Sequence, residues 1–296
     1  MSHIFTATTC QPQQLKQMPS ILQLYRKAIL PKKTKATSAD QIPHLSVELG
    51  SVNLNRNKVK EYSDVCEFYF DNQTVPVTYP HVLAFNLQLE LMANANFPIP
   101  LLGLVHVRNQ IQSYRSISLT DTLDFQVSIS EARDTDKGIE FDLTTRITCK
   151  GERVWESVST NLYRFKSTPK KAGSYTPQPL EPFRYSEFWD VKENTGRKYA
   201  KASGDSNPIH LYRWSAKAFG FKQAIIHGMW TKARTLAALE PLLKTHALKI
   251  TTEFKQPIFL PSRVLLHYNE YDTGMLFEVR NEANNKVHMK GNISTL

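Results

Sequence analysis

Cysteine is scarce in this 296-residue sequence, which contains only Cys10, Cys66 and Cys149. Their number is odd and no pair has CxxC spacing, so the sequence supports neither a disulfide framework nor a thiolate metal site. Long apolar runs are also lacking, because no stretch approaches the roughly 20 residues needed to cross a bilayer. We therefore expect a protein of a reducing compartment that does not span a membrane.

Extremes of composition are absent as well. Hydrophobic residues make up 41% of the chain and charged residues 22%, which excludes collagen-like, coiled-coil and wholly disordered proteins. Residues 1–14 are polar and lack the basic start and apolar stretch of a secretory signal. We expect a cytoplasmic protein, and its length accommodates two domains of ordinary size.

Acidic residues are outnumbered, with 27 Asp and Glu against 37 Lys and Arg, which gives a formal net charge of +10. Such a charge can attract nucleic acid, the phosphates of coenzyme A or an acidic carrier protein, and it also suits a merely solvated surface. Three basic residues, Arg213, Lys217 and Lys222, lie near the motif described below. Because no nucleic-acid-binding module is recognisable, we expect no nucleic-acid partner.

Two segments divide the chain. The apolar spacing of Leu15–Leu30 predicts a leading helix that ends at Pro31, and the residues that follow form a basic linker. The second segment is rich in proline and lysine, as expected of an exposed connection between two domains. The predicted segments are an N-terminal helix and linker (1–45), a first domain (46–165), a Pro-rich linker (166–185) and a second domain (186–296).

The two predicted domains repeat one plan. An apolar helical stretch, Val82–Ala95 in the first and Trp230–Leu239 in the second, precedes three strand-like segments. These segments are Leu123–Ile129, Phe141–Cys149 and Val154–Tyr163 in the first domain, and Val264–Tyr271, Met275–Val279 and Val287–Ile293 in the second. A helix lying across an antiparallel sheet would cover its apolar face, so two such units could form a pseudo-dimer. An unrelated pair of α+β domains is the alternative.

The run Ser203-Gly-Asp-Ser-Asn-Pro-Ile-His210 contains the candidate chemistry. Asn207 is a good N-cap and Pro208 suits the first position of a helix, which predicts a helix from about Pro208 with His210 in its first turn. Asp205 would face the same space from the preceding loop. A carboxylate and an imidazole can hold a water molecule between them, as addition of water to a conjugated C=C bond requires. Ordinary helix capping explains the same residue types, so the spacing alone leaves both interpretations open.

This stretch resembles the signature of the MaoC-like, or R-specific enoyl-CoA hydratase, family of hotdog-fold proteins. The family pattern is an aromatic residue, a spacer, Ser/Gly-Gly-Asp-x-Asn-Pro-hydrophobic-His and, after a further spacer, a small residue. The matching positions are Tyr199, Ser203, Gly204, Asp205, Asn207, Pro208, Ile209, His210 and Ala216. Further on, Phe219–Phe221 and Ile225–Met229 resemble the family's approach to its central helix.

The resemblance implies an α+β double hotdog, in which two antiparallel sheets each wrap around a central helix. It implies a (3R)-hydroxyacyl-thioester dehydratase or trans-2-enoyl-CoA hydratase of fatty-acid metabolism, acting on acyl-CoA or an acyl-carrier-protein thioester without a metal or redox cofactor. Asp205 and His210 would activate water, and the Gly228 N–H would polarise the thioester carbonyl. Asn207 and Ser203 would belong to the substrate-binding loop, Asn207 by shaping it.

The first domain resembles a degenerate hotdog. Val59–Tyr62 faintly echoes Arg197–Tyr199, but no Asp-His pair follows it. We therefore expect one active site per chain, a first hotdog widened or emptied for a longer acyl chain, and a monomeric pseudo-dimer or a homodimer. His227 is interpreted as a structural histidine, with a third catalytic group as the alternative.

Two other functions stay open from the sequence. A hotdog thioesterase would keep the fold and hydrolyse saturated acyl-CoA, although the Asp205 to His210 motif counts against it. A non-catalytic acyl-thioester binding module would account for the empty first domain and for the basic charge.

Overall fold

The computed structural model describes residues 11–28, 35–101, 103–164 and 182–296. Most of the predicted Pro-rich linker, 166–185, therefore lies outside the described residues, as do Cys10 and the end of the predicted leading helix. Cys66 and Cys149 are buried free thiols. No helix within the described ranges is long and apolar enough to span a membrane.

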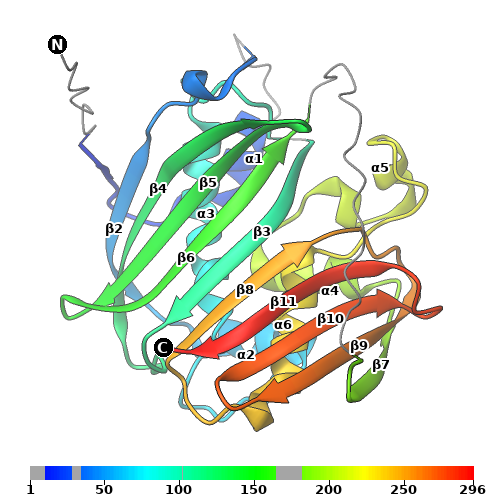
Figure 1. The fold of residues 1–296 in the computed structure, drawn as a ribbon. Helices are drawn as coiled ribbons and strands as arrows, with labels where there is room; N and C mark the ends of the chain where they lie inside the picture. The colour runs from blue at the N-terminus through cyan, green and yellow to red at the C-terminus, as the bar shows by residue number, and fades with distance from the viewer. Residues whose placement is uncertain (1–10, 29–34, 102, 165–181) are drawn as a thin grey trace, which may run out of the picture.

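Each half contains the same succession of a strand, a short helix, a long helix and four strands (Figure 1). The first half comprises β2 (Ser46–Asn53), α2 (Arg56–Cys66), α3 (Tyr79–Ala93), β3 (Leu104–Ser113), β4 (Thr122–Thr135), β5 (Gly138–Cys149) and β6 (Glu152–Tyr163). The second comprises β7 (Tyr185–Val191), α4 (Thr195–Ser203), α6 (Gly228–Leu239), β8 (Leu248–Phe254), β9 (Ser262–Tyr271), β10 (Gly274–Asn281) and β11 (Val287–Thr295).

Short elements complete the chain. Ahead of the first half lie β1 (Gln13–Gln14), α1 (Ile21–Ala28) and the 3-10 turn η1 (Ala39–Gln41). The second half also contains the 3-10 turn η2 (Pro208–His210), α5 (Arg213–Lys217) and the 3-10 turn η3 (Glu240–Leu242).

All the described strands join in one sheet, in the order β1-β2-β4-β5-β6-β3-β8-β11-β10-β9-β7. Within this order the five strands of one half mirror the five of the other. The halves meet where β3 pairs antiparallel with β8, from Arg108 opposite Glu253 to Ser113 opposite Leu248. The two sheets expected from the sequence are thus continuous across the seam between the halves.

The long helices α3 and α6 lie on the concave side of the sheet, behind it in Figure 1. Both are buried around most of their circumference, and the buried positions of α6 include the polar residues Thr231, Lys232 and Thr235. Leu87 and Leu91 of α3 and Ala233 and Leu236 of α6 are almost completely inaccessible to solvent. The core therefore lies between these two helices and the sheet.

Lys232 of α6 is the unusual side chain of this core because it is fully buried at the seam. Its ammonium donates to the side-chain and backbone oxygens of Asn109, at 2.6 and 3.2 Å, and to the Ile250 carbonyl at 3.4 Å. These three acceptors match its three N–H donors. Burial nevertheless lowers the pKa of Lys232 well below its usual value. One α6 side chain thus binds both seam strands, β3 and β8.

The leading helix is shorter than predicted, because α1 begins at Ile21 and the prediction of helix from Leu15 was wrong. Pro19 provides the physical reason, since a proline disfavours helical backbone in the residue before it. The central helices start slightly earlier than predicted, at Tyr79 and Gly228. The three meander strands predicted in each half are confirmed.

The seam strands β3 and β8 were not predicted. In β3 the buried positions are Asn109, Ile111 and Ser113, so apolar alternation is lost where polar side chains face the core. A search for alternating hydrophobic residues cannot find such a strand.

Candidate active site

The motif loop starts where α4 ends, at Gly204, whose left-handed backbone (φ 79°) suits glycine. The Ser203 hydroxyl accepts from the Asp205 N–H at 3.2 Å, and the Asn207 side chain accepts from the Ile209 N–H at 3.4 Å. Both side chains therefore shape the loop. The helix predicted from Pro208 is a single 3-10 turn, η2, because the chain is extended again at Tyr212 before α5 begins.

His210 is held at the end of this turn by a hydrogen bond from its Nδ1 to the Ile225 carbonyl at 2.8 Å. This bond assigns the proton to Nδ1 and leaves the Nε2 lone pair available as an acceptor. Burial lowers the pKa of His210, although Asp205 and the Ile225 carbonyl oppose the shift. A neutral imidazole with a free acceptor nitrogen is suited to act as a general base.

Asp205 keeps 29% of its side chain exposed. Its Oδ1 accepts from the Asn207 N–H and from the Tyr25 hydroxyl, both at 3.2 Å. Burial raises the pKa of Asp205, but His227, His210 and these two hydrogen bonds outweigh it, so the net pKa lies below the usual range. The carboxylate is therefore ionised at neutral pH, and its Oδ2 is left for another partner.

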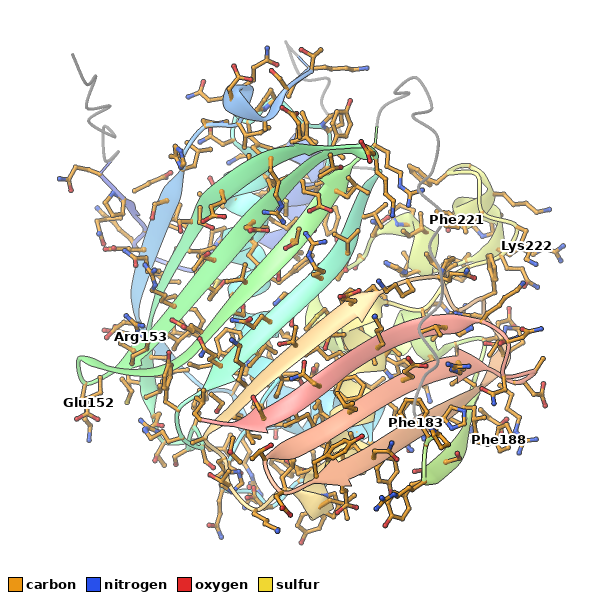
Figure 2. All side chains as sticks on the ribbon, in the orientation of Figure 1. Glu152, Arg153, Phe183, Phe188, Phe221 and Lys222 are labelled. Carbon is orange, nitrogen blue, oxygen red and sulfur yellow. The ribbon has the colours of Figure 1, made fainter. Side chains whose placement is uncertain are left out.

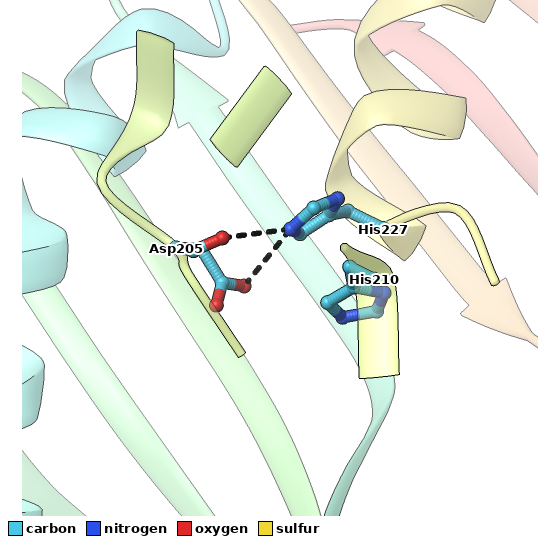
Figure 3. A group of neighbouring side chains, drawn as sticks. All are labelled: Asp205, His210 and His227. Atoms are coloured by element: carbon cyan, nitrogen blue, oxygen red, sulfur yellow. Dashed lines mark hydrogen bonds and ion pairs between the residues drawn. The ribbon is translucent and has the colours of Figure 1, made fainter. Parts of the chain in front are cut away.

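His227 immediately precedes α6 and is only 2% exposed. Its Nε2 donates to the Asp205 carbonyl at 2.9 Å and lies 3.9 Å from Asp205 Oδ2 (Figure 3). Its ring stacks on His210, with 3.7 Å between centroids. Burial lowers the pKa of His227 to about 3, so the ring is neutral. This geometry ties the motif loop to the start of α6.

One carboxylate oxygen of Asp205 and one ring nitrogen each of His210 and His227 lie within 4.8 Å of one another. A water molecule donating to two acceptors at about 2.8 Å each would separate them by about 4.6 Å. Asp205 and His210 therefore lie close enough for one water molecule to bridge them. The same three side chains are also those that could hold a metal ion, although Nδ1 of His210 and Nε2 of His227 are already engaged by carbonyls.

Gly228 is the first residue of α6, where a backbone N–H has no acceptor within the helix. An added Cβ would lie 3.0 Å from the Phe254 ring of β8, so a larger residue would force one of them to move. The helix N-terminus also provides positive potential. Because His227 precedes Gly228 and contacts Asp205, this amide borders the Asp205 and His210 pair.

The first half contributes two histidines that the sequence prediction missed. His81 of α3 and His106 of β3 stack at 6.2 Å between centroids, and the His106 ring lies 5.0 Å from that of Phe254. Burial lowers their pKa values to about 3 and about 4, and one nitrogen of each is buried without a hydrogen-bond partner. Neither lies in a recognisable motif, so no sequence signal indicated them.

Tyr25 was also missed, and it comes from α1, 180 residues before Asp205. Its hydroxyl donates to Asp205 Oδ1 and accepts from the Ser206 N–H at 2.9 Å. In the sequence Tyr25 is only one of several apolar positions in a short amphipathic helix. A contact across so many residues has no local signal.

Comparison with known proteins identifies similar chains. A model of the MaoC-like domain matches residues 175–292. The sequence is 31% identical over 261 residues to the 3-hydroxyacyl-thioester dehydratase X of Mycobacterium tuberculosis, covering 87% of this chain and 91% of that protein. The crystal structure of HtdX from the same organism matches with a TM-score of 0.75 and 29% identity, covering 85% of this chain and all of that one.

Another M. tuberculosis protein, described as having a double hotdog fold, matches with a TM-score of 0.52. The match is 10% identical and covers 89% of this chain and 96% of that one, so it bears on the fold alone. Together these similarities confirm the expected α+β double hotdog.

Proposed function

The chain belongs to the MaoC-like dehydratase family and is a hydro-lyase, and from this premise we propose the reaction that its site performs. Water adds reversibly to the C2=C3 bond of a trans-2-enoyl thioester and gives the (3R)-hydroxyacyl thioester. The observation that carries this proposal is the pairing of an ionised Asp205 with a neutral His210, whose ligand atoms lie within 4.8 Å of one another.

In the proposed mechanism the water donates one hydrogen to Asp205 Oδ2 and the other to His210 Nε2. This leaves an oxygen lone pair for C3. As the C3–O bond forms, an O–H bond breaks and His210 takes the proton, while the π electrons of C2=C3 move onto the thioester oxygen. The proton then passes to C2, so that one water is added in total. Dehydration follows the same steps in reverse.

The enolate oxygen formed on the way needs a hydrogen-bond donor, and the Gly228 N–H at the start of α6 is suited to that role. His227 positions the loop through the Asp205 carbonyl. Asn207 and Ser203 shape that loop. We propose no resident metal or redox cofactor, because proton transfer by Asp205 and His210 is sufficient for water addition.

We favour acyl-CoA over a carrier-protein thioester, within fatty-acid metabolism, because of the surface beside η2. Trp214 is 73% exposed and stacks on Tyr212, whose other neighbour is the Arg197 guanidinium 4.9 Å from its ring centroid. Lys222 projects from the loop after α5 (Figure 2). Stacking aromatic side chains and cations suit an adenine ring and phosphates. Ser215 donates to the Pro208 carbonyl at 2.6 Å and fixes this surface to the motif.

All the residues proposed to react belong to a single chain, so we propose that one pseudo-dimeric chain is a complete catalytic unit. We place it in the cytoplasm, where Cys66 and Cys149 would stay reduced.

Hydration of a trans-2-enoyl-CoA series by the purified protein tests the proposed reaction. Asp205→Asn and His210→Ala should each lower kcat/KM by about 10²- to 10⁴-fold, as expected on removal of a general acid or base. Chiral analysis of the product should show the (3R) alcohol. Full activity in both variants would refute the assignment. Release of free CoA from saturated acyl-CoA would instead indicate a thioesterase, and binding without turnover would indicate a binding module.

A further inference from the structure

Helix α1 packs against the central helix of the first half and reaches the motif loop of the second. Leu24 is 1% exposed, and Lys27 forms an ion pair with Glu90 of α3 at 3.6 Å. The Asn86 side chain of α3 donates to the Pro19 carbonyl at 2.9 Å. On the side of the loop, an added Cβ at Gly204 would lie 3.9 Å from Ile21. The helix is thus anchored on α3 with its Tyr25 face toward Asp205.

The Tyr25 hydroxyl completes the hydrogen bonds of one Asp205 oxygen. Oδ1 receives the Tyr25 O–H and the Asn207 N–H, whereas Oδ2 is the oxygen that lies toward His227. The same hydroxyl accepts from the Ser206 N–H. Two adjacent residues of the loop are therefore fixed by one side chain from outside the second half. A carboxylate with one oxygen held in this way cannot rotate freely.

We propose that Tyr25 is a positioning residue of the active site, which orients the Asp205 carboxylate so that Oδ2 receives the reacting water. The proposal rests on the catalytic role proposed for Asp205. The active site then extends beyond the matched MaoC-like region, 175–292, to a helix near the start of the chain. Tyr25 touches neither water nor thioester in this role, and it acts only through Asp205 and Ser206.

The contact should also affect protonation. The groups that influence Asp205 are Tyr25 on α1, Tyr199 on α4, His210 on η2 and His227 before α6, with His81 and His106 from the first half. Of these, the Tyr25 hydrogen bond helps to lower the pKa of Asp205. Burial and the Asp205 charge raise the pKa of Tyr25, so its hydroxyl stays protonated as a donor. Loss of that donor should raise the pKa of Asp205.

The test is Tyr25→Phe, which keeps the ring packed and removes only the hydroxyl. We expect kcat for enoyl-CoA hydration to fall about 10- to 100-fold, as for loss of a hydrogen bond to a charged group, with KM nearly unchanged. The acid limb of the pH profile should move to higher pH. In an Asp205→Asn background the same change should cost much less, because a positioning residue has no effect without the residue it positions.

Tyr69→Phe is the matched control, since Tyr69 is 85% exposed, and it should leave kcat unchanged. Leu24→Ala loosens α1 while keeping the hydroxyl, and it should lower kcat less than Tyr25→Phe does. Carbon-13 NMR titration of the Asp205 carboxyl tests the contact without turnover. If the wild type does not hydrate enoyl-CoA but the pKa of Asp205 still rises in Tyr25→Phe, the proposed reaction is overturned and the hydrogen bond between Tyr25 and Asp205 is supported. An active wild type with unchanged kcat and pH profile in Tyr25→Phe would overturn the role of Tyr25.

Discussion

The two halves of the molecule share a framework and differ in the loop that follows the short helix. Tyr62 and Glu67 are five positions apart, as are Tyr199 and Gly204, and both Glu67 and Gly204 are left-handed C-caps. The ring centroids of Tyr62 and Tyr199 lie 6.0 Å apart, with the rings tilted by 52° to each other. The faint sequence echo between these segments thus corresponds to a real structural equivalence.

The next residue separates the halves chemically. Phe68 follows the C-cap in the first half, where Asp205 follows it in the second. The pocket beside Phe68 is lined by apolar side chains such as Val75 and Trp155 together with polar ones such as Arg115 and Glu240. The comparison teaches that the repeated fold provides the framework twice, whereas the loop after the short helix supplies the acid-base groups only once.

The largest effect is expected from Asp205→Phe, which gives the second half the residue that the first half has at this position. Hydration should fall by about 10²- to 10⁴-fold in kcat/KM because the carboxylate that holds the water is gone. Loss of enoyl-thioester absorbance measures the rate, and Phe68→Leu in the other half is the control, expected to keep wild-type activity. Retention of more than a tenth of the activity in Asp205→Phe would contradict the prediction.

The starts of the two central helices allow a second comparison. Gly228→Ala should lower kcat about 10- to 100-fold, since the new methyl meets Phe254 at 3.0 Å and displaces an amide proposed to stabilise the enolate. Tyr79→Phe, at the first residue of α3, should have no such effect. Steady-state kinetics measure both. If displacement is the cause, Phe254→Leu should restore part of the rate of Gly228→Ala, and no recovery would argue against it.

An exposed aromatic residue in each half gives a smaller contrast. Trp214→Ala should raise KM for an enoyl-CoA about 5- to 100-fold, as expected on loss of stacking with one base. It should leave KM for the matching enoyl-pantetheine unchanged, because that substrate has no nucleotide. Tyr69→Ala, in the first half, serves as the control. Equal effects on both substrates would exclude nucleotide binding at Trp214, and an effect confined to carrier-protein thioesters would indicate a protein partner.

The smallest expected effect is that of pH, because the histidines of both halves should stay in the same protonation state near neutral pH. The pKa values of His81, His106 and His227 are about 3, about 4 and about 3, and that of His210 is lowered too. All four rings should therefore stay neutral from pH 8 to 6.5, and kcat/KM should change less than about twofold in that window and fall only at more acidic pH. Histidine NMR titration checks the protonation directly. A histidine of either half that titrates near pH 7 would contradict the assignment.

The local parts of the fold and site were predictable from the sequence. Strands β4 and β5 alternate apolar and polar residues, and the Asp205 to His210 loop has a dense motif. Tyr25 could not be found in the same way, because it reaches Asp205 through tertiary packing, and the stacked pair His81 and His106 lies in no recognisable motif. The seam strand β3 escaped prediction because Asn109 and Ser113 face inward. Sequence periodicity reports burial of apolar groups, so polar core positions at a junction are invisible to it.

The pairing of β3 with β8 also has a consequence for synthesis. When the first half emerges from the ribosome, β6 can pair with one edge of β3. The opposite edge of β3 stays unpaired until β8 is made, more than a hundred residues after β3. An unpaired strand edge is a template for association with other chains. The nascent chain is therefore most vulnerable to aggregation between completion of β6 and arrival of β8, and pairing at the seam removes that hazard only once β8 has been made, with β9 to β11 still to follow.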